Sequence, residues 1–370
     1  MCVMVTDSVS FNVLCKGQLE YFKESLGLDI TLVCGGNVVE LQELRRRNIG
    51  RVVFIPFKRR PALCRDIYCL FLLFAFFCRN RFDMVLYSTP KAMLLGAISS
   101  AFSFQRNRVA LVRGRAYENF VGVKRFVYSM LDKVSLFLSK RVIFISSSLK
   151  DAYISEKVVG SDKSLVLANG SSNGVDVNRF NPGHERHGPL RVVSVGRICI
   201  DKGVQQLNEI VRRVKCREPS VEFELVGKIE DELAFGIVRD LSKIDGVTYV
   251  ANNSRVEDVF QRADVHLFLS HREGFGNVAL EAAACGVPTL ALDVVGVRDS
   301  VAQGVSGVRF DVNDFFDIAD EIVWAAKNRT AFREKYSGAR KWAVENYSQD
   351  VVWNAYAEFF KGLLDYGERL

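Results

Sequence analysis

The sequence predicts an α/β protein of two doubly wound, Rossmann-like parallel-sheet domains with a cleft between them. The chain has 370 residues, whereas a single hydrophobic core stops growing at roughly 250–300 residues. Hydrophobic residues make up 49% of the chain and charged residues 25%, which suits two ordinary cores and excludes a disordered or low-complexity protein. Short β-branched runs alternate with longer amphipathic stretches in both halves, as in a parallel sheet covered by helices on both faces.

The first half, residues 1–180, is expected to form the N-terminal domain. Its strands are expected over the short apolar runs Cys2–Val5, Ile30–Cys34, Val52–Ile55, Met84–Tyr87, Val109–Val112 and Val142–Ile145. Its helices are expected over the longer amphipathic stretches Leu14–Leu26, Pro61–Arg79, Pro90–Phe104, Lys124–Leu138 and Ser148–Glu156. This alternation is the pattern of successive βαβ units.

Two tracts rich in Gly, Asn, Ser and Pro, at 169–174 and 181–189, indicate turns and a linker before the pattern restarts. Residues 190–348 are expected to form a C-terminal domain with strands over Arg191–Val195, Glu222–Val226, Val247–Val250, Val265–Leu269 and Thr289–Leu292. Helical patterns then cover Asp314–Lys327, Thr330–Asn346 and Gln349–Asp365. Residues 349–370 are expected to be a helix that packs back on the N-terminal domain.

The charge of the chain is unevenly distributed. The net charge is +7, with 27 basic and 15 acidic side chains in residues 1–190 and 23 basic and 28 acidic side chains in residues 191–370. A basic half joined to an acidic half indicates that one domain faces something anionic. A nucleic acid, a membrane surface and a phosphorylated substrate all meet that description.

The cysteines and the apolar runs predict a cytoplasmic protein that is soluble or peripherally attached to a membrane. The nine cysteines are odd in number, scattered and without a C-x-x-C pair, which favours reduced core residues over disulfides or zinc. The chain opens without a signal-peptide pattern. The longest apolar run, Cys69–Cys78, has ten residues, whereas a transmembrane helix needs about 20.

The first candidate site segment directly follows the strand expected at Arg191–Val195. Gly196 leaves the backbone flexible at the strand end, and Arg197 and Lys202 lie five residues apart before a helix. Two cations beside a helix N-terminus suit a diphosphate, and ligands of open α/β sheets bind at this end of the strands. The alternative is a solvated turn with two surface cations.

The second candidate segment follows the strand expected at Val265–Leu269. Gly274 and Gly276 allow the backbone to approach a ligand, and Asn277 is suited to open a helix. Glu273 stays in the loop while Glu281 lies one helical turn after Asn277. Two carboxylates eight residues apart can accept hydrogen bonds from the hydroxyls of one ligand. Glu281 is surrounded by Ala and Leu and is expected to be buried, so it needs a partner.

Taken together, these residues resemble the retaining glycosyltransferases of the GT-B fold, family four. Gly196-Arg197 with Lys202-Gly203 is similar to the Arg/Lys diphosphate clamp of that family, and Glu273 with Glu281 is similar to its E-x7-E motif. The flanking tracts 173–182 and 286–299 fit the same pattern, and the tracts 89–96 and 113–118 resemble the bacterial capsule and O-antigen branch. The resemblance covers essentially the whole chain.

The resemblance implies a hexosyltransferase that moves a sugar from a nucleotide-sugar, by family precedent a UDP-sugar, to a saccharide carried on a polyprenyl diphosphate in capsule or O-antigen synthesis. Arg197 and Lys202 would bind the donor diphosphate, Glu281 the ribose and Glu273 the transferred sugar. Backbone N–H groups are expected near the phosphate from Phe275, Gly276 and Asn277. No metal and no cofactor is expected, because no D-x-D triplet occurs in the sequence.

The N-terminal domain departs from the family pattern. Where many relatives have a Gly-rich loop after the first strand, this chain has residues 6–12 without a glycine, and Ser8 and Ser10 are the candidates to line the cleft. Arg113 and Glu118 follow a predicted strand and are the acceptor-side candidates. The alternative for this second pair is a surface arginine and a glutamate at a helix entry.

Three further interpretations stay open or are disfavoured at this point. The helix expected around Cys69–Phe77, flanked by Arg59, Arg60 and Arg79, is either a core-facing helix or an aromatic-rich helix at a bilayer interface.

A sugar-nucleotide epimerase or hydrolase would use the same donor cleft, but the N-terminal half has no histidine for acid–base work. Nucleic-acid binding is disfavoured because the aromatic residues of this half read as helical and buried.

The histidine-containing run 184–187 favours a linker over a metal site. It reads His-Glu-Arg-His between Pro-Gly and Gly-Pro. This spacing differs from the zinc-binding H-E-x-x-H pattern, and the flanking Gly and Pro indicate a solvated linker.

Overall fold

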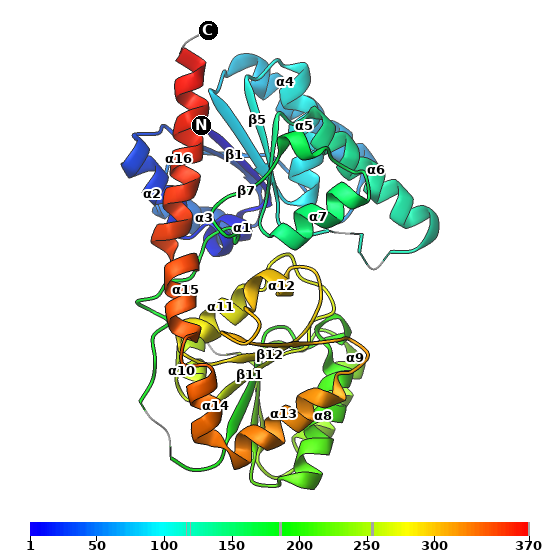
Figure 1. Ribbon diagram of the computed structural model, residues 1–370. Helices are drawn as coiled ribbons and strands as arrows, with labels where there is room; N and C mark the ends of the chain where they lie inside the picture. Colours follow the sequence, from blue (N-terminus) through cyan, green and yellow to red (C-terminus); the bar gives the residue numbers. More distant parts are fainter. Residues whose placement is uncertain (116, 119, 185–186, 253–254, 369–370) are drawn as a thin grey trace. The chain divides into compact units, whose positions relative to one another are not determined.

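The computed structural model of the protein describes residues 1–115, 117–118, 120–184, 187–252 and 255–368 (Figure 1). The chain divides into two compact units. The N-terminal unit consists of Met1–Asn173 together with Asp350–Leu370, and the C-terminal unit consists of Gly174–Gln349. Each is an α/β unit built on a parallel sheet, as the alternating sequence pattern predicts.

The N-terminal unit contains a seven-stranded sheet in the order β3-β2-β1-β4-β5-β6-β7, in which all neighbouring strands pair in parallel. Its strands are β1 (Cys2–Asp7), β2 (Thr31–Gly35), β3 (Arg51–Phe54), β4 (Met84–Ser88), β5 (Asn107–Val112), β6 (Arg141–Phe144) and β7 (Ser164–Val166). The central strands β1, β2 and β4 are buried almost throughout, because helices cover both faces of the sheet.

The helices of this unit are α1 (Ser8–Leu14), α2 (Gln18–Leu26), α3 (Val38–Arg46), α4 (Leu63–Arg79), α5 (Pro90–Phe102), α6 (Gly122–Leu138) and α7 (Ser147–Ser155). The middle helix α5 is largely buried and packs against α4 on one side and α6 on the other (Figure 1). The last helix, α16 (Gln349–Glu368), also belongs to this unit, where Phe360 meets Phe22 with ring centroids 5.2 Å apart.

The single helix predicted over Leu14–Leu26 is wrong, because the chain breaks between α1 and α2 at Gly17. Gly17 has φ +78°, and a Cβ atom there would lie 2.7 Å from the ring of Trp353 in α16. A glycine is therefore needed both for the backbone conformation and for the close approach. The sequence analysis also missed α3 and the edge strand β7, which is only three residues long.

The C-terminal unit contains a six-stranded parallel sheet in the order β10-β9-β8-β11-β12-β13. Its strands are β8 (Arg191–Val195), β9 (Glu222–Val226), β10 (Val247–Val250), β11 (Val265–Phe268), β12 (Thr289–Leu292) and β13 (Gly307–Phe310). Four of the five predicted strands match the observed bounds, and the fifth ends one residue earlier. The sequence analysis missed β13, a short edge strand that pairs with β12.

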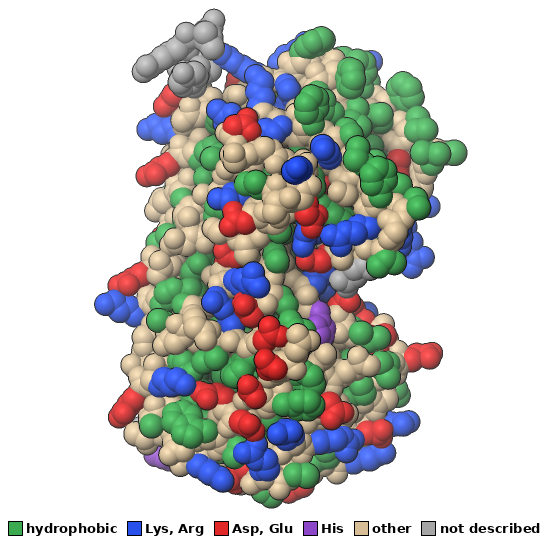
Figure 2. Space-filling view, turned by 45° about the vertical axis from the view of Figure 1, so that its right-hand side comes forward, with side chains coloured by type: hydrophobic (Ala, Val, Ile, Leu, Met, Phe, Trp, Pro, Cys, Tyr) green, Lys and Arg blue, Asp and Glu red, His purple; other side chains and the backbone are tan. Residues whose placement is uncertain are grey.

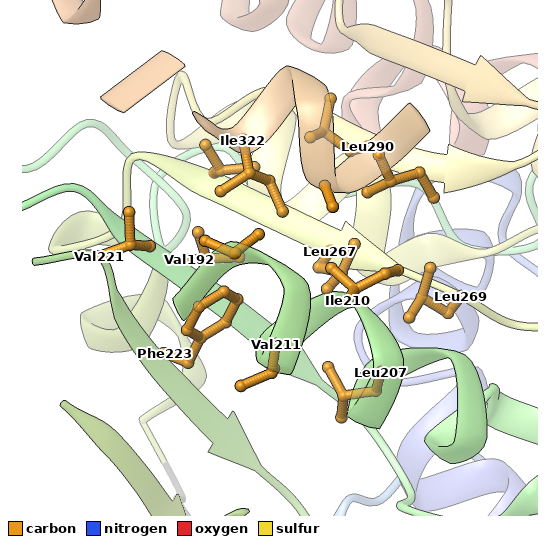
Figure 3. Close-up of a cluster of buried hydrophobic side chains, with 14 of the residues drawn as sticks. Val192, Leu207, Ile210, Val211, Val221, Phe223, Leu267, Leu269, Leu290 and Ile322 are labelled. Atoms are coloured by element: carbon orange, nitrogen blue, oxygen red, sulfur yellow. The ribbon is translucent and has the colours of Figure 1, made fainter. Parts of the chain in front are cut away.

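The helices of the C-terminal unit are α8 (Val204–Arg217), α9 (Glu232–Leu241), α10 (Val256–Gln261), α11 (Asn277–Ala284), α12 (Val297–Ser300), α13 (Phe316–Lys327), α14 (Arg329–Lys335) and α15 (Ala339–Tyr347). Figure 3 shows the core in which side chains of α8 and α13 meet the strands, with Ile210, Leu267 and Ile322 among its members. The single helix predicted over Thr330–Asn346 is wrong, because α14 and α15 are separated by a turn at 336–338.

Candidate functional site

A polar pocket of the C-terminal unit lies where the strand order of its sheet reverses. The chain leaves β8 toward β9 on one side, whereas β11 lies on the other side of β8. Ligands of open α/β sheets bind at such a switch point, outside the carboxyl ends of the strands. Here a pocket of about 370 Å³ is lined by the residues after β8, the residues after β11 and the start of α11.

Most of the predicted donor-site residues line this one pocket. Those that do are Gly196, Arg197, Lys202, Glu273, Gly276, Asn277 and Glu281. The other two lie in the same loop but do not line it. The side chain of Phe275 is buried against Tyr347, with ring centroids 5.4 Å apart, and the backbone of Gly274 lies against Gly296.

Lys202 and Glu273 connect the two loops of the pocket. The Lys202 ammonium group forms an ion pair with the Glu273 carboxylate and donates a hydrogen bond to Ser270 Oγ at 3.0 Å. Gly203 allows the loop after β8 to lie close to the end of β11. Its φ is +75°, and a Cβ atom there would lie 2.2 Å from the carbonyl oxygen of Leu269. The sequence analysis did not single out Ser270, although its position directly after a strand was a signal for it.

Arg197 is the more exposed cation of the pocket. Its side chain is 55% exposed and donates to Glu230 Oε2 at 2.7 Å. An arginine held by one surface carboxylate remains able to turn toward an anion, because an exposed pair of this kind contributes little free energy. The partner Glu230 lies just before α9, so the sequence spacing around Arg197 could not reveal it.

The N-terminus of α11 faces the pocket. Gly276 precedes the helix with φ +82° and makes no side-chain cap, and Gly276, Asn277 and Val278 line the pocket. The first N–H groups of a helix lack intrahelical acceptors, and the helix dipole favours negative charge at this end. The observed N-cap is therefore Gly276, one residue before the Asn277 that the sequence analysis expected to open the helix.

Glu281 is a half-buried carboxylate that lines the pocket, less buried than the sequence predicts. Burial raises its pKa to about 7; the nearby Arg179 opposes this shift and the nearby Glu257 adds to it. Arg179 is itself committed to an ion pair with Glu257 at 2.7 Å. Within the described part of the chain, no side chain donates a hydrogen bond to Glu281. A hydroxyl-bearing ligand would supply the partner that this half-buried acceptor needs.

A neutral histidine lies behind the pocket in β11. His266 is fully buried, its ring is stacked with Phe268 at a centroid distance of 5.6 Å, and its Nδ1 lies 3.1 Å from Thr289 Oγ1. Burial lowers the pKa of His266 to about 3. Its Nε2 atom is buried without a hydrogen-bond partner among the described residues. His266 therefore packs as a neutral core residue against Phe268, which lines the pocket.

A second pocket lies in the N-terminal unit, where the order of that sheet reverses between β1 and β4. It encloses about 540 Å³, and α5 and α6 contribute apolar walls while the ends of β1 and β4 contribute polar groups. The hydroxyls of Thr6 and Thr89 lie 2.8 Å apart and join the two strand ends. Lys91 and Asp66 form an ion pair at 2.7 Å on its rim. This end of the pocket is polar, whereas the end toward α6 is apolar at Val127 and Leu131 but also includes Tyr128 and Asp132.

The structure places the four acceptor-side candidates in different surroundings. Ser10 lines the N-terminal pocket, whereas Ser8 is fully buried and its Oγ has no partner among the described residues. Arg113 points inward to Ser172 Oγ and to Cys15 Sγ, and Glu118 forms an ion pair with Arg115 at 2.6 Å. Ala116 of the tract 113–118 lies outside the described residues, as do Glu185 and Arg186 of the histidine-containing run.

The described residues hold no cluster of three or more His, Cys, Asp or Glu side chains that could bind a metal ion. All nine cysteines are free thiols. No helix of the described chain is both long enough and apolar enough to cross a bilayer.

Comparison with protein families places the matched region over the C-terminal pocket. Residues 178–342 match the family "Glycosyl transferases group 1". Over 99% of this chain and 97% of the relative, the sequence is 29% identical to the capsular polysaccharide biosynthesis glycosyltransferase CapM of Staphylococcus aureus. A D-inositol 3-phosphate glycosyltransferase of Geodermatophilus obscurus is 31% identical over 50% of this chain and 46% of its own.

Solved structures share the fold of the whole chain. HepE of Anabaena, solved with UDP, superposes with a TM-score of 0.78 at 16% identity over 98% of this chain and 100% of that chain. Sucrose-phosphate synthase of Thermosynechococcus elongatus superposes with a TM-score of 0.79 at 16% identity over 99% of each chain. The two parallel-sheet units thus have the GT-B architecture that the sequence resemblance implied. This chain is a glycosyltransferase, and its residues 178–342 match the group 1 glycosyl transferases.

Proposed function

We propose that the protein is a retaining glycosyltransferase that moves a sugar from a UDP-sugar to a lipid-linked saccharide in the synthesis of a cell-surface polysaccharide of the capsule or O-antigen type. The observation that carries the donor assignment is the C-terminal pocket. It combines two cations, a helix N-terminus and the half-buried acceptor Glu281, which together suit a diphosphate and a ribose. In support, the HepE structures were solved with UDP and with UDP-glucose.

In this proposal, different residues of the pocket bind different parts of the donor. Arg197, Lys202 and the N-terminus of α11 would bind the diphosphate, and Glu281 would accept hydrogen bonds from the ribose. During transfer the bond between the sugar C1 and the diphosphate oxygen breaks, and a bond from C1 to an acceptor oxygen forms on the same face. The acceptor hydroxyl proton passes to the departing diphosphate. The cations act by stabilising the negative charge that develops on this leaving group.

The proposed acceptor is supported by the similarity to CapM and by the positive charge of the N-terminal half. CapM is a glycosyltransferase of capsular polysaccharide biosynthesis by its name. Polyprenyl diphosphates are anionic and lie at a membrane, and residues 1–190 carry 27 basic against 15 acidic side chains. A cytoplasmic enzyme that attaches peripherally to the inner face of the cell membrane fits both observations.

The proposal is tested by donor binding and product analysis. Thermal-shift and calorimetric titration against a panel of UDP-, GDP- and ADP-sugars should single out a UDP-sugar. Arg197→Ala should weaken UDP binding and reduce transfer at least about 100-fold. Arg239, an exposed arginine on α9, forms an ion pair with Asp240, and Arg239→Ala should leave both properties unchanged. Proton NMR of the product reports the anomeric configuration. Inversion at C1, or release of free sugar or an epimerised nucleotide-sugar in place of a glycosylated acceptor, would contradict the proposal.

A further inference from the structure

The helix α4 exposes apolar side chains along the side that faces away from the core. Only Cys69, Leu73 and Phe77 are buried, at intervals of four residues. The exposed set comprises Leu63, Ile67, Tyr68, Phe71 and Phe74, and Phe71 is 68% exposed. Packing against the core therefore explains the three buried residues of α4 but not the exposed apolar residues on its outer side.

The helix α6 repeats this arrangement. Its exposed apolar residues Val123, Phe126, Met130, Val134 and Phe137 follow one another at intervals of three and four residues, so they form one stripe along the helix. Phe126 is 66% exposed. Amphipathic helices of soluble proteins normally turn such a stripe toward the core, and a large exposed apolar patch marks an interaction site. Figure 2 shows hydrophobic side chains gathered on this part of the N-terminal unit.

The two stripes, called here the α4–α6 face, lie on either side of α5 and flank the mouth of the N-terminal pocket. Val127 and Leu131 of α6 are exposed and also line that pocket, whose floor includes Leu94 and Leu95 of α5. The apolar end of the pocket is thus continuous with the exposed apolar surface. The polar end lies at Thr6, Asp7 and Thr89, where Arg59 pairs with Asp7 at 3.3 Å.

The positive charge around the α4–α6 face favours an anionic partner. The segment from Lys58 to Lys140 contains 15 Lys and Arg but only 4 Asp and Glu. Of those four, Asp66 is paired with Lys91, Glu118 with Arg115, Asp132 is buried, and Asp83 is exposed. Exposed cations remain at both ends of α4, including Arg60 and Arg79. An apolar strip bordered by cations is the pattern of a helix that lies in the interface of an anionic bilayer.

We propose that the α4–α6 face docks the N-terminal unit on an anionic bilayer, and that the pocket opening in this face receives the lipid-linked acceptor directly from the lipid layer. The saccharide occupies the polar end between the ends of β1 and β4, and the isoprenoid chain leaves across Val127 and Leu131 into the membrane. This inference rests on the proposed function for the identity of the acceptor, whereas the docking itself does not.

Docking is tested by flotation with vesicles of phosphatidylglycerol and phosphatidylcholine, without any donor. The protein should float with these vesicles, less with pure phosphatidylcholine, and less as salt rises, because the Debye length is only about 8 Å at physiological salt. The double variant Phe71→Ser/Phe126→Ser should reduce the bound fraction at least about tenfold. Phe235→Ser, which removes a 58% exposed phenylalanine from α9 of the other unit, should bind as the parent does. A melting curve and UDP titration verify that each variant is folded.

Two results would overturn the docking. One is vesicle binding that is absent at low salt or indifferent to Phe71→Ser/Phe126→Ser. The other is a dimer in analytical ultracentrifugation without lipid that this same variant dissociates, since the face would then be an interface between two copies. Reversal of Arg59, Arg60 and Arg79 to Glu should release the protein from vesicles while UDP binding persists.

The pocket is tested by a change at its apolar end. Val127→Trp should narrow the path of the chain and raise KM for a long-chain acceptor at least about tenfold more than KM for a short-chain analogue, and Val127→Ile should restore the parent ratio. An equal rise for both acceptors would overturn the pocket assignment. If vesicle binding depends on the face but no sugar is transferred from any nucleotide-sugar, the proposed function fails and the docking stands.

Discussion

Lys202 and Glu273 form an ion pair between the loop after β8 and the loop after β11, and Lys202 also donates to Ser270 Oγ at 3.0 Å. Both side chains are largely shielded from water, so each neutralises the other while the pocket holds no donor. A diphosphate would compete with Glu273 for the ammonium group and would free the carboxylate to accept hydrogen bonds from sugar hydroxyls. One contact therefore links the two loops of the proposed donor site.

The ion pair predicts that substitutions of Lys202 and of Glu273 change UDP affinity in opposite directions. Lys202→Met removes a phosphate ligand and should weaken UDP binding, while Glu273→Gln removes the competitor for Lys202 and should maintain or increase it. Both variants should lower kcat/KM by about 100-fold or more, since each removes a group that acts on the reacting donor. Calorimetry with UDP and initial rates provide the two measurements. Equal weakening of UDP by both variants would argue against the competition.

Glu281 should make the free enzyme less stable as pH rises. Its pKa is about 7 in the folded state, above the ordinary value of about 4.3, so the folded state binds more protons than the unfolded state between these values. The free energy of unfolding should therefore fall with rising pH across that range and become flat above it. Glu281→Gln should remove this dependence and stabilise the free protein above pH 7 by up to about 3 kcal/mol.

The same variant should weaken nucleotide binding, because an amide is a poorer acceptor for ribose hydroxyls than a carboxylate. Urea unfolding at several pH values and UDP titration at pH 8 would measure both effects in one preparation. Glu257→Gln, which alters the neighbouring carboxylate, serves as the comparison. A Glu281→Gln protein with parental stability at every pH would exclude the half-buried carboxylate as the cause.

His266 should make the protein sensitive to acid. Its pKa is lowered to about 3 in the folded state, against about 6.5 when exposed, so the unfolded state binds the extra proton between these values. Stability should be fully present above pH 6.5 and decline as pH falls, by up to about 1.4 kcal/mol per pH unit from this group. His266→Leu should flatten the decline, and His187→Ala, at an exposed linker position, should not. Melting curves over this range would show the difference.

Transfer should continue in excess EDTA. The pocket supplies cationic side chains and helix N–H groups for the diphosphate, and the described residues contain no cluster of acidic, His and Cys ligands for a divalent ion. The measurement is the initial rate before and after chelation, with Mg²⁺ and Mn²⁺ added back. Complete loss on chelation that either ion restores would show that a metal assists the leaving group.

Local pattern alone was sufficient to predict the fold class and which residues line the polar pocket of the C-terminal unit. Buried parallel strands have short, nearly continuous apolar runs, and four strands of the C-terminal sheet were predicted with their exact bounds. The residues that follow β8 and β11 must meet at one edge of the sheet, because parallel strands end on the same side. Gly196, Lys202 and Glu281 could therefore be assigned to one pocket without any structure.

Only the tertiary structure decided which groups meet and which faces are left uncovered. The pairing of Lys202 with Glu273, the partner Glu230 of Arg197 and the burial of His266 all join residues distant in sequence. The break at Gly17 depends on Trp353, more than three hundred residues further along the chain. The apolar spacing of α6 is visible in the sequence, but such a stripe predicts a core-facing side. The buried helix α5 lies between α4 and α6, so the outer apolar residues of these two helices are left exposed. Whether a residue is buried depends on which elements pack against it, and the spacing of residues along one helix does not contain that information.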